Sequence, residues 1–151
     1  MSNVAVSSEE AKTKTAGVRP THGAHRVLIV DDDKTIRELF LQVVSYGLPN
    51  CRVDLAVNGA EAVEEFRQAR HSVLVMDLKM PVMDGEQAFA EIVKLCKAES
   101  WTMPSVIFCS GYVPSDRISI IIEDSPAHCL LLKPITAGQL LDAIKVRLPP
   151  E

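Results

Sequence analysis

Five short apolar runs separate longer amphipathic stretches along this chain. The runs occupy residues 27–30, 52–57, 73–76, 106–109 and 129–132. Four of them are continuously apolar, whereas residues 52–57 alternate between apolar and polar side chains in the manner of a strand. Between the runs, apolar positions recur every three or four residues, which is typical of amphipathic helices. The pattern therefore predicts five strands and five helices in strict alternation.

Polar residues in front of the amphipathic stretches mark where the helices begin. The candidate N-caps are Asn58, Asp84, Ser115 and Thr136. All except Ser115 are followed three residues later by Glu or Gln, which is the spacing of a capping box. The pair Pro149–Pro150 ends the last predicted helix, because proline cannot continue one.

Strict alternation of strands and helices predicts βαβ units, and continuously apolar strands predict a parallel sheet that is covered on both faces. Right-handed crossovers then favour a doubly wound α/β fold, a five-stranded (βα)5 arrangement with helices on both faces. Residues 26–148 form this single predicted domain. Residues 1–25 have no apolar period and mix Ser, Thr, Glu and Lys, so they are predicted to be a disordered leader; residues 149–151 are a short tail.

The composition and charge of the chain argue against several classes of protein. The 151 residues include 16 Lys and Arg against 20 Asp and Glu, a formal net charge of −4. The basic residues form no cluster, which argues against a nucleic-acid surface. No apolar run approaches the roughly 20 residues of a membrane span, and the first residues lack a signal-peptide pattern, so we expect a cytoplasmic protein. The four cysteines lack the spacing of a zinc site or disulfide framework and are expected to be structural.

The chemistry of the chain is concentrated directly after the apolar runs. The residues in these places are Asp31, Asp32 and Asp33 after the first run, Asp77 after the third, Ser110 and Gly111 after the fourth, and Lys133 and Pro134 after the fifth. Ligands of open α/β sheets bind at the carboxyl ends of the strands. We therefore expect carboxylates, a hydroxyl and an ammonium group to converge at one edge of the sheet.

Neighbouring carboxylates repel one another by about 4 kcal/mol per pair at 4 Å and an effective dielectric near 20. A hard divalent cation relieves that repulsion, and oxygen ligands without His or Cys favour Mg²⁺. Mg²⁺ commonly shares its coordination with a phosphate, so the predicted chemistry is phosphoryl transfer. A single Asp after a strand is more often a helix cap, and this is the role expected for Asp33.

Four segments contain the residues expected at this edge: Val27–Asp33, Val75–Gly85, Ser110–Tyr112 and Leu132–Ile135. The second contains Asp-x-x-Met-Pro-x-Met-Asp-Gly, the most specific of the four. Together they resemble the signature segments of the response-regulator receiver domain, which has a flavodoxin-like fold. The resemblance covers roughly residues 26–148, the whole predicted domain.

The resemblance implies a role for each residue of the predicted site. Asp77 would accept a phosphoryl group from a phosphohistidine of a histidine kinase or a histidine phosphotransfer protein. Mg²⁺ would be bound directly by Asp32, largely through water by Asp31, and by Asp77 and the backbone carbonyl of Lys79. Ser110 and Lys133 would contact the phosphoryl group, and the Lys133–Pro134 bond would be cis. Apart from its own phosphorylation and dephosphorylation, no enzyme activity is implied.

The chain departs from the family pattern three residues before Lys133, where Leu130 replaces the usual aromatic residue. A leucine cannot report the movement of the Ser110 hydroxyl by swinging a polar ring. Tyr112 is a candidate substitute near the site. Lys79 places a cation beside the path of an attacking water, and we expect Lys79 and Tyr112 to set the lifetime of the phosphorylated form.

Two alternatives stay open at this point. Asp31, Asp33 and Thr35 also match the Asp-x-Asp-x-Thr motif of haloacid dehalogenase-like phosphatases, with Asp31 as nucleophile and Asp33 as general acid–base. That motif leaves Asp77 unexplained, and beyond Lys133 only Asp142 and Glu151 offer further carboxylates. The other alternative is a receiver-like scaffold that binds a partner without phosphorylation.

Since no output domain follows Leu148, we expect a stand-alone receiver, or an excised one, acting on an unidentified protein target without contacting nucleic acid or membrane.

Overall fold

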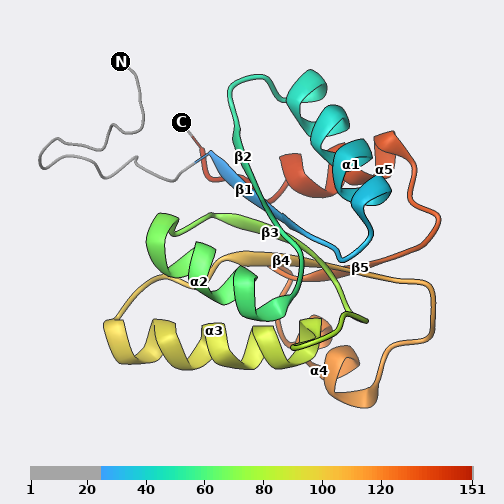
Figure 1. Cartoon of the computed structure of the whole chain (residues 1–151). Coiled ribbons are helices and arrows are strands. Elements are labelled where there is room, and N and C mark those ends of the chain that lie inside the picture. Colours follow the sequence, from blue (N-terminus) through green and yellow to red (C-terminus); the bar gives the residue numbers. More distant parts are fainter. Residues whose placement is uncertain (1–24, 151) are drawn as a thin grey trace, which may run out of the picture.

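The computed structural model describes residues 25–150, and its strands and helices alternate as the sequence predicts (Figure 1). The strands are β1 (Arg26–Val30), β2 (Arg52–Ala56), β3 (Val73–Asp77), β4 (Ser105–Ser110) and β5 (Cys129–Leu132). The helices are α1 (Lys34–Gly47), α2 (Gly59–Ala69), α3 (Gly85–Glu99), α4 (Asp116–Asp124) and α5 (Ala137–Lys145). The expected leader lies outside the described residues except for His25, whose carbonyl accepts a hydrogen bond from the Arg52 amide. None of the described helices is both long and apolar enough to cross a membrane.

The five strands form one parallel sheet in the order β2-β1-β3-β4-β5. Helices α1 and α5 cover one face, and α2, α3 and α4 cover the other (Figure 1). Alternate residues of a strand point to opposite faces, so Val27 and Ile29 pack towards α1 and α5 while Leu28 and Val30 pack towards the other three helices. The predicted doubly wound α/β class is confirmed.

The covering of the sheet is less complete than the apolar runs predict. Every residue of the central strand β3 is buried, but Leu132 at the end of β5 is 60% exposed. The two runs are equally apolar in sequence. Their difference follows from strand order, because β5 lies at the edge of the sheet and β3 lies at its centre.

The predicted helix starts are confirmed, with one change of detail. Asp84 with Gln87 and Thr136 with Gln139 form complete capping boxes. At α2, the Asn58 side chain accepts a hydrogen bond from the Glu61 amide as predicted, but the Glu61 carboxylate accepts its bond from the amide of Val57, the residue before the cap. Ser115 caps α4 through the Ile118 amide.

A buried histidine ties the start of β5 to β4. The Val106 amide donates a 3.0 Å hydrogen bond to Nδ1 of His128, and the ring of Phe89 packs against the imidazole at a centroid distance of 5.2 Å. Nδ1 can accept this bond only while the imidazole is neutral. Burial, with a smaller contribution from the Arg147 guanidinium, lowers the pKa of His128. Protonation therefore removes a buried hydrogen bond.

We expect this histidine to make the folded protein less stable in mild acid. The unfolded chain takes up the proton near the ordinary pKa of about 6.5, whereas the native state resists it to lower pH. The free energy of unfolding therefore falls as the pH drops from about 6.5 towards the lowered native pKa. Urea unfolding followed by the fluorescence of Trp101, the single tryptophan, should show a smaller loss of stability over this range in His128→Asn. Parallel curves for the two proteins would contradict the assignment.

Candidate functional site

Three carboxylates converge where β1 and β3 end. Ligand oxygens of Asp31, Asp32 and Asp77 all lie within 4.8 Å of one another. Because β1 and β3 are neighbours in the sheet, the end of each strand brings its acidic residue to the same edge. Asp31 and Asp77 are buried and Asp32 is exposed, so the cluster has a closed inner side and one carboxylate at the surface.

Lys133 reaches both buried carboxylates from the far side of β4. Its Nζ lies 3.2 Å from Oδ2 of Asp31 and 3.4 Å from Oδ1 of Asp77. Burial on its own would lower the pKa of Lys133, but the charges of Asp31 and Asp77 and their hydrogen bonds raise it above its ordinary value. The ammonium group is therefore held charged between the two acids.

One ammonium group does not neutralise the site. Burial and the negative charge of Asp31 raise the pKa of Asp77, and the opposing effects of Lys133 and the Lys79 amide do not cancel that rise. The excess negative charge and the all-oxygen donor set fit a hard divalent cation such as Mg²⁺. The acidic cluster thus has the chemistry of a cation site.

Asp31 is more firmly fixed than Asp32. Its Oδ1 accepts a 2.9 Å hydrogen bond from the Asp33 amide while its Oδ2 contacts Lys133, and its backbone carbonyl accepts a 2.8 Å bond from Arg37. Asp33 caps α1 by accepting bonds from the Thr35 and Ile36 amides. The capping role predicted for Asp33 is confirmed.

The Ser110 hydroxyl lies at the end of β4, but its hydrogen bonds go to its own loop rather than to Asp77. Oγ donates a 2.9 Å bond to the Tyr112 carbonyl and accepts a 3.0 Å bond from the Tyr112 amide. Ser110 is buried, whereas the next residues of the loop, Gly111 to Val113, are exposed. Lys133–Pro134 is a cis peptide bond, as the resemblance implies.

The three residues expected to modulate the site lie at different depths around it. Lys79 is exposed two residues after Asp77, and Tyr112 is 69% exposed on the β4–α4 loop. Leu130 is half-buried on β5, opposite Phe108 of β4, and packs with the core under α2, α3 and α4. Leu130 is therefore a packing residue on the sheet face that α2, α3 and α4 cover.

The sequence profile of the response regulator receiver domain matches residues 27–145. The chain belongs to this family. Receiver domains interact with kinases and downstream effectors and bind Mg²⁺ at an acidic pocket, and in this receiver three aspartates form a cluster that could hold a metal ion. The chemotaxis protein CheY of Bacillus subtilis (strain 168) is 34% identical over 122 residues, which cover 80% of this chain and 95% of CheY.

Other relatives carry a receiver as one part of a larger protein. The protein-glutamate methylesterase/protein-glutamine glutaminase of Aliivibrio fischeri is 38% identical over 87 residues, and this receiver spans about a fifth of its length (22%). Among solved structures, the response regulator domain of Thermotoga maritima CheB superposes with a TM-score of 0.67 at 27% identity, covering 83% of this chain and 97% of that one. A CheY-like receiver from Methanospirillum hungatei superposes with a TM-score of 0.68 at 25% identity, covering 82% of this chain and 92% of its own.

The loop after β3 holds a strained residue that sequence reasoning missed. Val82 has a φ of 71°, and the Met83 amide donates a 2.8 Å hydrogen bond to the Pro81 carbonyl, which closes a three-residue turn around it. Positive φ is unfavourable for a β-branched residue. The Val82 side chain is 82% exposed, so packing does not compensate for the strain.

Replacing Val82 by asparagine should therefore stabilise the receiver. Asparagine accepts the left-handed region more readily, and relief of the strain should raise the free energy of unfolding by about 1 kcal/mol. Val113→Asn is the matched control, because Val113 is 91% exposed and its φ is not positive. Urea unfolding of both variants measures the difference. A gain equal to that of the control would mean that lost surface hydrophobicity, not strain, causes it.

Proposed function

We propose that this receiver accepts a phosphoryl group on Asp77 from a phosphohistidine of a histidine kinase or a histidine phosphotransfer protein. The observation that carries the proposal is the position of the Lys133 ammonium, within 3.4 Å of both Asp77 and Asp31 at an edge crowded with carboxylates. A cation fixed beside a carboxylate can hold the oxygens of an incoming phosphoryl group, which carries up to two negative charges.

In the proposed transfer, a carboxylate oxygen of Asp77 attacks phosphorus. The new O–P bond forms as the P–N bond of the phosphohistidine breaks, and the imidazole leaves with the electron pair of that bond. Lys133 stabilises the charge that develops on the phosphoryl oxygens. The Ser110 hydroxyl donates to one of these oxygens after it leaves its two bonds to Tyr112.

Three carboxylates and one carbonyl would hold Mg²⁺ in the proposed site. The exposed Asp32 would bind it directly, whereas both oxygens of Asp31 are already engaged, which supports contact through water. Asp77 and the Lys79 carbonyl complete the proposed set. When bound, the ion would add positive charge beside the phosphoryl oxygens.

The rim of the site favours a protein as phosphodonor. Exposed apolar side chains stand on three of the loops that follow strands at this edge. They are Val57, Val82, Tyr112 and Val113. Exposed apolar side chains that gather on one surface are typical of a site that is covered by a partner. In the proposed cycle, departure of Ser110 from Tyr112 moves the β4–α4 loop and changes the surface of α4, β5 and α5 for a downstream protein.

Labelling with acetyl phosphate and Mg²⁺ tests the proposal directly. Intact mass should rise by one phosphoryl group, peptide mapping should place it on Asp77, and Asp77→Asn should stay unmodified. Label on Asp31 would favour the haloacid dehalogenase-like alternative, although Asp33, its general acid–base, is already engaged as a helix cap. A protein that stays unmodified in every case would favour the scaffold alternative.

Lys79→Asn should change the lifetime of the phosphorylated protein. In hydrolysis, water adds to phosphorus, the O–P bond to Asp77 breaks, and phosphate is released. Lys79 is exposed two residues after Asp77, and in the proposed site its ammonium group would lie beside the path of that water. We expect the rate of label loss, measured after removal of the donor, to change severalfold in Lys79→Asn and in Tyr112→Ala. Lys94→Asn, at an exposed lysine on α3, is the control, and equal rates in all four proteins would contradict this assignment.

A further inference from the structure

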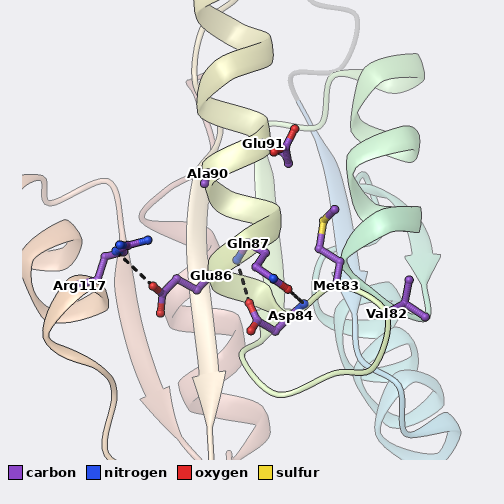
Figure 2. A pocket seen from close by; sticks show the side chains of 8 residues that line it. All are labelled: Val82, Met83, Asp84, Glu86, Gln87, Ala90, Glu91 and Arg117. Atoms are coloured by element: carbon purple, nitrogen blue, oxygen red, sulfur yellow. Dashed lines mark hydrogen bonds and ion pairs between the residues drawn. The ribbon is translucent and has the colours of Figure 1, made fainter.

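The first turns of α3 and α4 are joined by one carboxylate. Glu86 Oε1 accepts a 3.0 Å hydrogen bond from the Ser115 hydroxyl, and Glu86 Oε2 lies 3.4 Å from Nε of Arg117. Figure 2 shows Glu86 and Arg117 facing each other from the two helices. Both residues line a cavity of about 360 Å³. We call Glu86, Ser115 and Arg117 the clasp. Ser115 is also the N-cap of α4, so the clasp holds the residue at which that helix begins.

The α3 side of the clasp is fixed relative to Asp77. Gly85, the residue before Glu86, donates a 3.0 Å hydrogen bond to the Leu78 carbonyl. Its Cα packs so closely on the Asp77 carbonyl oxygen that a Cβ would collide with it. The hydrogen bond from Gly85 to Leu78 therefore resists movement of Glu86 away from the end of β3.

The segment between β4 and α4 has few other anchors. A Cβ added at Gly111 would have no atom within 4 Å, Tyr112 is 69% exposed, and Val113 is 91% exposed. At one end of this segment the Ser110 hydroxyl is bonded to Tyr112, and at the other end Ser115 is bonded to Glu86. The two ends are thus held in the arrangement in which the Ser110 hydroxyl is bonded to Tyr112.

We propose that Glu86 is a positioning residue that holds the β4–α4 segment in this arrangement and so limits how readily Asp77 takes up a phosphoryl group. The inference rests on the proposed function, because it assumes phosphorylation of Asp77. Release of the clasp frees the segment, the Ser110 hydroxyl leaves Tyr112 more easily, and the arrangement that receives the phosphoryl group becomes more populated.

Glu86→Ala removes both contacts of the clasp. Glu91→Ala is the matched control, because Glu91 lies on the same helix and lines the same cavity but pairs with Lys94 of its own helix. Two readouts are compared: amide hydrogen exchange over residues 111–118, and the rate at which acetyl phosphate with Mg²⁺ labels Asp77. Both rates should rise about fivefold in Glu86→Ala, as expected for the loss of one hydrogen bond and one exposed ion pair, and neither should rise in Glu91→Ala.

Two further variants separate the clasp from general loosening of the fold. Glu86→Gln keeps an oxygen that can accept from Ser115 but loses the charge opposite Arg117, so its rates should be intermediate. The double variant Glu86→Ala/Arg117→Ala should have nearly the same exchange and labelling rates as Glu86→Ala alone, because the two residues share one contact. If each substitution instead loosened the fold in general, their effects would be additive in the double variant, and the labelling of Asp77 would slow.

The outcomes distinguish a failure of the clasp inference from a failure of the proposed function. Faster exchange together with faster labelling supports the inference. Unchanged exchange in Glu86→Ala overturns it, and so does faster exchange without faster labelling of a protein that accepts phosphate. If the wild-type protein takes no label at all, the proposed function has failed, and the regulatory inference that depends on it falls too, even where exchange shows that the clasp holds α4.

Discussion

Lys133→Met should lower the free energy of unfolding of the metal-free receiver by about 3 kcal/mol. Methionine keeps the unbranched apolar part of the side chain but leaves Asp31 and Asp77 buried beside each other without the ammonium that lies 3.2 and 3.4 Å from them. Removing one partner of a buried ion pair is costly because the remaining charge is neither solvated nor compensated. Urea unfolding in the presence of a chelator, followed by Trp101 fluorescence, measures the loss.

Addition of Mg²⁺ should return part of that stability. An ion that binds only the folded state stabilises it by about 1.4 kcal/mol at ten times its dissociation constant. The variant should gain more than the wild type at a given Mg²⁺ concentration, because no ammonium competes for the carboxylates. Lys79→Met is the control, since Lys79 is exposed and its loss should leave the metal-free stability unchanged. Equal metal-free stability of Lys133→Met and the wild type would show that the Lys133 pairs contribute nothing.

The strands and helices follow from the sequence because their signals are local. An uninterrupted apolar run such as residues 73–76 places apolar side chains on both faces of a strand. Both faces are buried only when helices cover the sheet on each side. Asp84 with Gln87 satisfies the first amides of α3 through contacts three residues apart. The exposure of Leu132 could not be predicted in this way, because it depends on which strand lies at the edge of the sheet.

The acidic cluster could be predicted for a related reason. Parallel strands end at one edge, so the residues that follow neighbouring strands meet there whatever their separation in sequence. This brings Asp31, Asp77 and Lys133 together, as the sequence predicts. The orientation of the Ser110 hydroxyl could not be predicted, because its two hydrogen bonds form within a turn that leaves no pattern in sequence.

The contacts of Glu86 and His128 leave no signal in the sequence. An acidic residue in the first turn of a helix, such as Glu86, is ordinarily explained by the helix dipole alone. Its contacts with Ser115 and Arg117 lie about thirty residues away in the chain and require the packing of α3 beside α4. The acceptor role of His128 is hidden likewise, because an isolated histidine before an apolar run carries no sign of its partner amide.

Gly85→Ala should destabilise the receiver by about 3 kcal/mol, the upper end of the cost of forcing atoms into a well-packed interior. A Cβ at this position would collide with the Asp77 carbonyl oxygen and would lie 3.1 Å from Cα of Leu78, both backbone atoms that cannot turn aside as a flexible side chain can. The glycine of the Met-Asp-Gly segment is thus required by the close approach of α3 to the end of β3. Urea unfolding measures the loss, and labelling by acetyl phosphate should slow because the strand end that carries Asp77 is displaced.

Gly111→Ala is the matched control for this prediction. It lies in the loop next to the site, but an added Cβ would have no atom within 4 Å and the residue is exposed. Its stability should stay within about 0.5 kcal/mol of the wild type, as for other surface substitutions. Equal stability of Gly85→Ala and Gly111→Ala would show that α3 can move away from β3 at little cost. Glu86 would then have no fixed position relative to Asp77 from which to hold α4.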